Sequence, residues 1–309
     1  MKYTKQALSE AQLLARWRDK GLIIKDEPAA LNALQFVGYF RLRGYALSLM
    51  TAANGQRMFR PGVTFDDIIR RYDFDRELRR ITLGQLERIE VAIRTVISNH
   101  MSLHYGPFWY INHPQQVLGQ APGPRGKPVP FQIGKLLADI ERDTHRSKDL
   151  FAQHYYAKYT DPLLPPSWLV AECITFRQWS NIYEHLQKAD PQQPNPKKEV
   201  ARTFGLSVPL VGSWLHVLSI LRNTCAHHGR IWNRRFVLTP ETYQQAQSHF
   251  ADPRSYYCLA VVMRLFTKPV DMNDEWPIRL SDLLKAYPDI PPQEMGFPNN
   301  WDADDLWNS

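Results

Sequence analysis

Apolar residues recur three and four positions apart along much of the chain, which is the pattern of helices that bury one face. The longest example contains Leu86, Ile89, Ile93 and Val96, separated by charged positions. We therefore predict one long helix over residues 64–105, and a chain built mainly from packed helices.

Start and stop signals divide the rest of the chain into further helices. Ser9 with Gln12 and Thr64 with Asp67 each form a capping-box pattern, and Gly21 supplies a stop. Proline and glycine breaks supply the other boundaries. Besides the long helix, the expected helices are residues 9–21, 26–38, 168–183, 197–204 and 256–266, one through Leu136, Leu137 and Ile140, one opened by Ser207 and one that starts at Pro240.

Two proline-rich segments interrupt this pattern. Residues 112–130 contain five prolines and three glycines, and residues 189–196 contain three prolines. Because proline lacks a backbone donor, we predict that both segments are irregular loops. The fold prediction is an all-α protein with an N-terminal helical extension (1–63), a helical core (64–270) and a C-terminal extension (271–309).

Composition narrows the function classes. The 309 residues carry 38 Lys and Arg against 31 Asp and Glu, a formal net charge of +7. This excess favours a polyanionic partner, with RNA, DNA and a membrane surface all open at this point. Three cysteines without close pairing indicate neither a disulfide framework nor a zinc site. Because no stretch resembles a signal peptide or approaches the roughly 20 apolar residues of a membrane span, we expect a cytoplasmic protein without a membrane partner.

The groups best suited to chemistry on a phosphodiester gather near residue 225. Arg222 and His227 are five positions apart, and Asn223 follows the arginine directly. Arginine binds anionic oxygens, and histidine, with an ordinary pKa of about 6.5, exchanges protons at neutral pH. The alternative is that these residues only tie helices together. The same stretch adds further polar side chains: His228, Arg230, Arg234 and Arg235.

A metal site or a thiol nucleophile is a weaker interpretation of this stretch. Neighbouring residues such as His227 and His228 point about 100° apart on a helix, and no acidic ligand lies nearby. Cys225 falls on the apolar side of its helix, which makes it a poor nucleophile. We therefore expect neither a metal nor a cofactor.

Several blocks of the chain resemble known families. The spacing Arg222-Asn223-x3-His227 resembles the Arg-x4-6-His signature of HEPN-domain ribonucleases. The wider chain resembles the Abi-like family of abortive-infection proteins, of the AbiD and AbiF type, although family members often have glycine where Arg177 stands. The blocks that carry this resemblance are Gly38-Tyr39-Phe40-Arg41-Leu42-Arg43-Gly44-Tyr45, Glu87-Arg88-Ile89-Glu90, the Pro-x-Trp-x3-Glu motif that ends at Glu172, and the tail with Gly296-Phe297-Pro298 and Trp301-x5-Trp307.

The resemblance implies a HEPN-like helical bundle as the core and a metal-independent endoribonuclease in antiphage defence. In such an enzyme the 2′-hydroxyl of RNA attacks the adjacent phosphorus and leaves a 2′,3′-cyclic phosphate. His227 would act as general base or acid, Arg222 would stabilise the phosphorane charge, and Asn223 would orient the phosphate or the histidine. The residues expected to bind the RNA backbone are His228, Arg230, Arg234, Arg235, Arg41 and Arg43.

The spacing of the signature restricts how its residues meet. Five positions place Arg222 and His227 about 140° apart on a helix. A working site then needs the arginine to reach round, a helix that ends near His228 and Gly229, or a second copy of the motif. The resemblance implies the last of these, a homodimer with a composite active site. We add, as a hypothesis, a restraining partner that is either a noncoding RNA or an antitoxin.

Three charged residues are expected to support the site. Glu90 and Arg94 lie four apart on the long helix and form either a surface ion pair or, as the family block implies, support for the signature. Glu172 lies in an apolar helix and needs a partner, for which Arg222 is a candidate. Arg94 and His100 also have an Arg-x5-His spacing, but His100 falls on the apolar stripe and is assigned to the core.

The segment from Tyr39 to Tyr45 alternates aromatic residues and arginines. Such a surface can stack on unpaired bases and follow phosphates, but on these residues alone aromatic packing in the core is favoured. The competing function is a non-catalytic RNA-binding module of a defence or toxin–antitoxin system. A helical scaffold that binds another protein is a third class, and it would need no basic excess.

Overall fold

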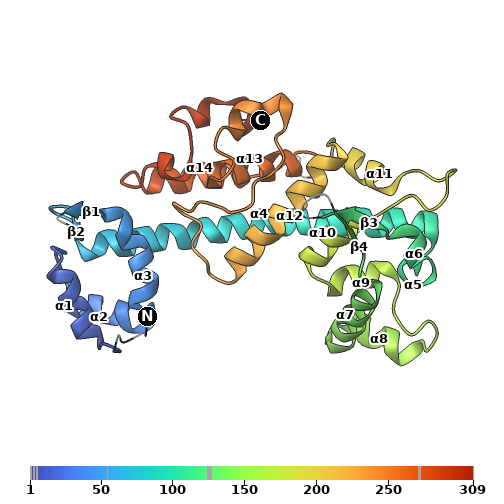
Figure 1. Ribbon diagram of the computed structural model, residues 1–309, viewed down its shortest axis with the longest axis horizontal. Helices are drawn as coiled ribbons and strands as arrows, with labels where there is room; N and C mark the ends of the chain where they lie inside the picture. Colours follow the sequence, from blue (N-terminus) through green and yellow to red (C-terminus); the bar gives the residue numbers. More distant parts are fainter. Residues whose placement is uncertain are drawn as a thin grey trace.

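The predicted long helix is the axis of the molecule. The computed structural model describes Lys2, Thr4 and residues 6–53, 55–123, 127–270 and 273–308. Helix α4 (Phe65–Tyr105) is 41 residues long, begins at the capping box of Thr64 and Asp67, and ends before Gly106. Figure 1 shows α4 running along the length of the molecule with the other elements arranged around it.

The N-terminal elements pack at the beginning of α4. The capping box of Ser9 and Gln12 starts the first helix, and the Asp26 side chain caps the second, so both predicted helices are confirmed. The buried Trp17 ring anchors this part of the chain against Phe65 at the start of α4. In chain order the elements are α1 (Glu10–Arg18), α2 (Glu27–Phe36), α3 (Tyr39–Ala46), η1 (Leu47–Leu49), and the antiparallel strands β1 (Met50–Ala53) and β2 (Gln56–Phe59).

The first proline-rich segment is more regular than its composition predicts. It forms α6 (Pro114–Val117) and an antiparallel pair of strands, β3 (Gln120–Pro122) and β4 (Pro128–Pro130), after α5 (Trp109–Asn112). Pro114 occupies the first turn of its helix, where no backbone donor is needed, and both strands are edge strands, which tolerate proline. The prediction of an irregular loop over 112–130 is therefore wrong for these parts, and residues 124–126 lie outside the described residues. The second segment has no helix or strand before Pro196, as predicted.

The predicted helix over 168–183 is two helices. Ile174 has an extended backbone, and the side chain of Thr175 forms a capping box with Gln178 that starts a new helix. The local capping signal therefore interrupts the apolar run that suggested continuity. The elements of this region are α7 (Ile133–Arg146), α8 (Leu150–Lys158), α9 (Ser167–Cys173) and α10 (Phe176–His185).

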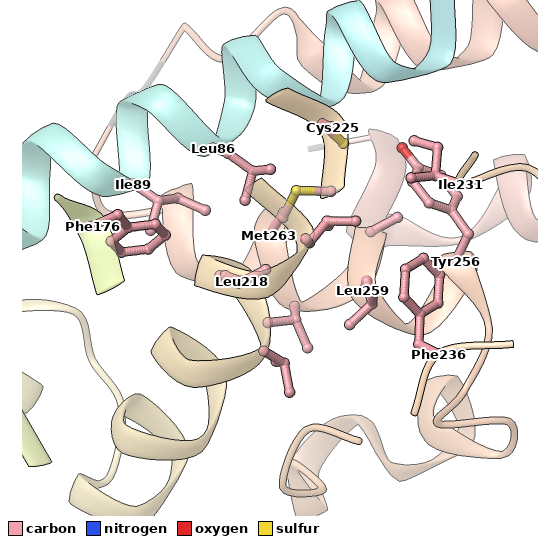
Figure 2. Packing of buried hydrophobic residues seen from close by; sticks show 14 of the residues in the cluster. Leu86, Ile89, Phe176, Leu218, Cys225, Ile231, Phe236, Tyr256, Leu259 and Met263 are labelled. Carbon is pink, nitrogen blue, oxygen red and sulfur yellow. The ribbon is translucent and has the colours of Figure 1, made fainter. Parts of the chain in front are cut away.

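The core lies where α4 meets α12 (Val208–Ala226) and α13 (Tyr256–Thr267). Figure 2 shows side chains of the three helices pointing toward one another, among them Leu86, Leu218 and Met263. All three are 0% exposed. Apart from loops and turns, the described part of the chain consists of helices and two small two-stranded sheets, which confirms the all-α prediction.

The C-terminal extension covers α13 with aromatic side chains. Phe297, Trp301 and Trp307 are buried, and Phe297 and Trp307 contact the ring of Tyr257 on α13. The helix predicted from Pro240 is instead a 3-10 segment that starts four residues later, so that prediction is wrong. The remaining elements are α11 (Pro196–Thr203), η3 (Gln244–Phe250), α14 (Trp276–Ala286), η4 (Pro292–Met295), η5 (Trp301–Ala303) and α15 (Asp305–Asn308).

No single helix in the described part of the chain is long and apolar enough to cross a membrane. Helices α11 and α12 meet the criteria of length and composition only as a pair that is bent by 74°. The division of the chain at residues 63 and 270 stays a prediction.

Candidate functional site

The signature occupies the C-terminal end of α12. The helix ends at Ala226, His227 is its C-cap, and His228 adopts a left-handed backbone with φ of 58°. The N–H of His228 donates to the carbonyl of Cys225 at 3.0 Å, and the N–H of Gly229 donates to the carbonyl of Thr224 at 2.7 Å. These two bonds form a Schellman motif, which turns the chain sharply after the helix. His227 is exposed at this corner.

Gly229 is required by the close return of the chain. A Cβ atom at this position would lie 2.9 Å from Cγ2 of Thr224 and 3.0 Å from its carbonyl oxygen. Both distances are shorter than side chains normally allow, so a larger residue would push the turn away from the helix. The sequence His227-His228-Gly229 therefore sets the position of the exposed histidine through local backbone geometry.

Arg222 is held by the long helix. Its Nε donates to Oε2 of Glu90 at 3.2 Å, and Nη1 lies 3.5 Å from Oδ1 of Asn223. The side chain of Glu90 is 13% exposed and that of Arg222 is 36% exposed, so water screens the pair only partly. Glu90 therefore orients the arginine of the signature, which is the supporting position that the sequence assigned to it.

Arg94 reaches a different helix. Its Nη2 donates to Oε2 of Glu172 on α9 at 2.6 Å. Glu90 and Arg94 thus face two different helices rather than pairing with each other. Glu172 thus has the arginine partner that the sequence called for, but this partner is Arg94 and not the candidate Arg222. The expectation that Glu172 is buried is wrong, because its side chain is 48% exposed. Helix α9 is shorter than predicted, and Glu172 lies near its exposed end.

The chain after the signature is tied to a buried carboxylate, Asp75 of α4. Oδ1 of Asp75 accepts from the N–H groups of Ile231 at 3.0 Å and Trp232 at 2.7 Å. Oδ2 accepts from the hydroxyl of Tyr45 at 2.6 Å and from Nη1 of Arg79. Asp75 is 0% exposed. Burial raises its pKa, and the guanidinium of Arg79 with the other three donors acts in the opposite direction.

Several arginines assigned to RNA also bond within the protein. Nη1 of Arg41 donates to the carbonyl of His228 at 2.7 Å, and Nη1 of Arg230 donates to the carbonyl of Gly44 at 2.6 Å. Arg235 pairs with Asp252, and Arg234 donates to the carbonyl of Arg230 at 3.2 Å. Arg43 is exposed. The bonds of Arg41 and Arg230 fasten the turn after α12 to α3, and Arg41 and Arg234 are both exposed.

The blocks that meet at this corner match one family. A family model described as Abi-like protein matches residues 32–233, which is more than half of the chain. The chain belongs to the Abi-like family. Membership implies a role in abortive infection. No curated protein matches the chain, and no solved structure matches it.

The match covers Asp75 with its hydrogen-bond partners and the pair of Glu90 and Arg222 in this Abi-like protein. It begins within α2 and ends at Asn233, so Tyr45, Asp75, Glu90 and the signature all lie inside it. Tyr45 and Trp232 belong to its two ends, and their rings stack with centroids 6.0 Å apart. The N-terminal block of the family region therefore packs against the signature block.

The sequence reasoning missed Asp75, and it did not connect Tyr45 with Trp232. A signal for Asp75 existed, because the apolar stripe of α4 extended toward the N-terminus passes through position 75, and Arg79 follows one turn later. A carboxylate in that place needs buried partners. Nothing in the sequence indicated that two of them are backbone amides of residues 231 and 232.

Two other assignments are settled by burial. Cys225 of the Abi-like protein is 1% exposed, and burial raises the pKa of its thiol to about 12, so it is a poor nucleophile as expected. His100 is only half-buried, and its ring lies 4.5 Å from that of His104. The assignment of His100 to the core is therefore only partly correct. Among the described residues no group of three or more His, Cys, Asp or Glu side chains could hold a metal ion.

Proposed function

We propose that this Abi-like protein is an abortive-infection endoribonuclease that cleaves RNA without a metal ion. The observation that carries the proposal is the exposed His227 at the C-cap of α12, one turn beyond an arginine held by Glu90. His227 is the general base or acid, and Arg222 stabilises the charge that develops on the phosphorus. Asn223 lies between them in sequence, and its Oδ1 lies beside Arg222.

The reaction uses a group that the RNA itself supplies. The 2′-hydroxyl loses its proton and attacks the adjacent phosphorus, and the bond to the 5′-oxygen of the next nucleotide breaks. The leaving oxygen takes up a proton, so the products are a 2′,3′-cyclic phosphate and a 5′-hydroxyl. DNA lacks the 2′-hydroxyl and is not a substrate for this chemistry.

The active form that we propose is a homodimer. Because Glu90 draws Arg222 toward α4 while His227 lies at the exposed end of α12, a second copy brings the missing group to each site. In a dimer with two-fold symmetry, a contact from Arg222 of one copy to His227 of the other occurs twice, once in each direction. His228, Arg43 and the partly bonded Arg41, Arg230, Arg234 and Arg235 then contact the RNA backbone. A noncoding RNA or an antitoxin is the proposed restraint in an uninfected cell.

The test is cleavage of end-labelled RNA in EDTA by the purified protein and its variants. We expect cyclic-phosphate products from the wild type and none from His227→Ala or Arg222→Ala. The matched control is His154→Ala, because His154 is an exposed histidine on α8, outside the signature. That variant should cleave like the wild type, and DNA of the same sequence should stay intact.

The dimer is tested by mixing the two inactive variants. A dimer of Arg222→Ala with His227→Ala contains one composite site with both groups intact, so exchange of subunits should restore about a quarter of the activity. Mixtures that stay inactive would reject the composite site. RNA that remains intact but is bound equally by all variants would favour the RNA-binding module instead.

A further inference from the structure

A second concave site lies along the same helix, away from the signature. It is a cavity of about 390 Å³ between α7, the end of β4, α10 and α12. Cavities of roughly 300–1,000 Å³ that combine apolar walls with a few polar groups are typical ligand sites. None of the residues that line this cavity belongs to the network around Arg222, His227 and Asp75.

His216 connects this cavity to the signature. His216 lines the cavity and precedes His227 by eleven positions on the same helix. Eleven residues make three turns plus about 20°, so both histidines lie on one face of α12, about 16 Å apart along its axis. An RNA strand that follows this face from His227 therefore arrives at the cavity.

The walls of the cavity suit a flat ring with polar edges. Phe131 and the apolar side chains of Pro130 and Leu136 form one part of the lining. The ring of Phe131 meets that of His185 edge to face, with centroids 5.0 Å apart. Unpaired bases bind proteins by stacking on such aromatic rings. The cavity therefore has the apolar, aromatic surface that a base needs.

The other part of the lining offers hydrogen bonds that can select a base. Gln132 and Asn181 line the cavity, and their amides make no side-chain hydrogen bond with another described residue. A carboxamide both donates and accepts, which matches the edge of an unpaired base. His185 is 6% exposed, its Nδ1 bonds to the carbonyl of Asn181 at 2.8 Å, and its Nε2 has no partner among the described residues. A buried polar atom of this kind calls for a partner.

The charges around the cavity allow an RNA phosphate to approach. Lys135 and Arg177 are exposed at its wall and form no ion pair with another described residue. The carboxylate of Asp139 is paired with Arg142 at 2.7 Å. Glu184 also lines the cavity, and Nζ of Lys197 donates to the main-chain carbonyl of Glu184 at 2.6 Å. A cation therefore lies beside this acidic residue. The two free cations can therefore bind the phosphates on either side of a base in the cavity.

We propose that this cavity receives one unpaired nucleobase of the RNA that the signature cleaves, and that it thereby selects the position of the cut. The proposal rests on the proposed function for the presence of a cut. The base enters between Phe131 and the amides of Gln132 and Asn181, and the backbone then continues along α12 to His227. The cavity is thus a specificity site rather than part of the catalytic group.

The first experiment measures base binding without cleavage. The four nucleoside 5′-monophosphates are titrated into His227→Ala, Asn181→Ala and Gln132→Ala proteins by calorimetry. We expect His227→Ala to bind one or two of the four, and each amide variant to bind them roughly tenfold more weakly. Both amides are at the surface of the cavity, so the variants should fold, which their unfolding temperatures will confirm. Absence of binding to every protein would overturn the proposal.

The second experiment maps the cuts in a pool of RNA of random sequence. The wild type should prefer one base at a constant distance from the cut, and Asn181→Ala should lose that preference while it continues to cut. Arg177→Ala should raise the RNA concentration needed for half-maximal rate, whereas the matched control Arg146→Ala, an exposed arginine on α7, should not. If Asn181→Ala and Gln132→Ala cut the RNA pool at the same positions as the wild type, the proposal is overturned. If nucleotides bind in the first experiment but these cut positions are unchanged, the cavity is a site for a free nucleotide instead. If the protein binds nucleotides but cuts no RNA, the proposed function is rejected, whereas the binding of a base in the cavity stands.

Discussion

The backbone N–H of Trp232 donates a 2.7 Å hydrogen bond to Oδ1 of Asp75, across 157 positions of the chain. This bond connects the turn after α12 to α4 and α3, because the same carboxylate also accepts from Tyr45 of α3 and Arg79 of α4. The turn that follows the exposed His227 is thus bonded to a cluster whose members are all buried. A candidate catalytic histidine at a helix end needs such support, since helix ends otherwise fray.

Replacement of Asp75 should damage stability more than replacement of a surface carboxylate. Asp75→Ala leaves Arg79 buried without its partner and frees two backbone amides, so we expect a loss of about 3–5 kcal/mol in the free energy of unfolding. The control is Asp73→Ala on the same helix, whose partly exposed pair with Arg76 should contribute at most about 1 kcal/mol. Unfolding in urea measures both. Equal losses in the two variants would show that the network does not hold the turn.

Replacement of Glu90 should lower the rate of RNA cleavage through Arg222. Glu90→Ala frees the guanidinium to leave its position, and a displacement of this kind costs roughly 10–100-fold in kcat. Glu172→Ala is the matched control, because it removes the partner of Arg94 rather than that of Arg222. We expect the control to cleave RNA at nearly the wild-type rate in single-turnover kinetics. A similar loss in both variants would contradict a specific role of Glu90.

His228 carries a backbone conformation that favours glycine. Its φ of 58° is left-handed, and a side chain there costs roughly 1–2 kcal/mol, part of which glycine loses again through its greater freedom in the unfolded chain. His228→Gly should therefore raise the free energy of unfolding by about 1 kcal/mol. His227→Gly, at the ordinary φ of −89°, should not stabilise the protein. Thermal unfolding distinguishes these outcomes, and destabilisation by His228→Gly would mean that the imidazole itself holds the turn.

His100 should make the protein less stable in acid. Burial lowers the pKa of His100, and His104 lowers it further, against a smaller opposite effect of Glu199. The unfolded chain therefore binds more protons, so the stability from neutral His100 is complete above about pH 6.5 and decreases as the pH falls toward the lower pKa of the folded state. His100→Leu should lose less stability than the wild type between about pH 7.5 and about pH 5. Parallel pH profiles for the two proteins would reject this role.

Local signals in the sequence predicted a large part of the fold. The capping boxes at Ser9 and Thr64 and the apolar stripe through Leu86 and Ile93 depend only on residues within a turn or two of each other, and the structure has the helices that they indicate. The failures came where one local rule competed with another. Thr175 starts a new helix inside an apolar run, and Pro114 and Pro128 belong to short regular elements in a segment that composition marks as irregular.

The candidate site was predicted in its residues but not in its pairing. Glu90, Arg94, Glu172 and Arg222 were all singled out, and an arginine partner was expected for Glu172. That partner is Arg94 and not the candidate Arg222, because the choice between partners depends on how α9 and α12 lie against α4. Asp75 was missed altogether, since two of its partners are backbone N–H groups, which every residue except proline has and which the sequence therefore does not single out. The cavity beside His216 was missed for a related reason. Its lining comes from four elements, and their proximity is a property of the packed chain.

The sequence by itself determined the helical class, most helix ends and the chemical groups of the signature, because periodicity, capping and residue type act over short stretches of chain. Only the tertiary structure decided that Glu90 holds Arg222, that Asp75 bonds to the turn after His227, and that a cavity lies beside His216 of α12. These relationships join residues that are far apart in sequence. They arise because the other helices pack against the apolar stripe of α4 and bury it. Each charged side chain that is buried in this packing then needs a partner among the groups around it.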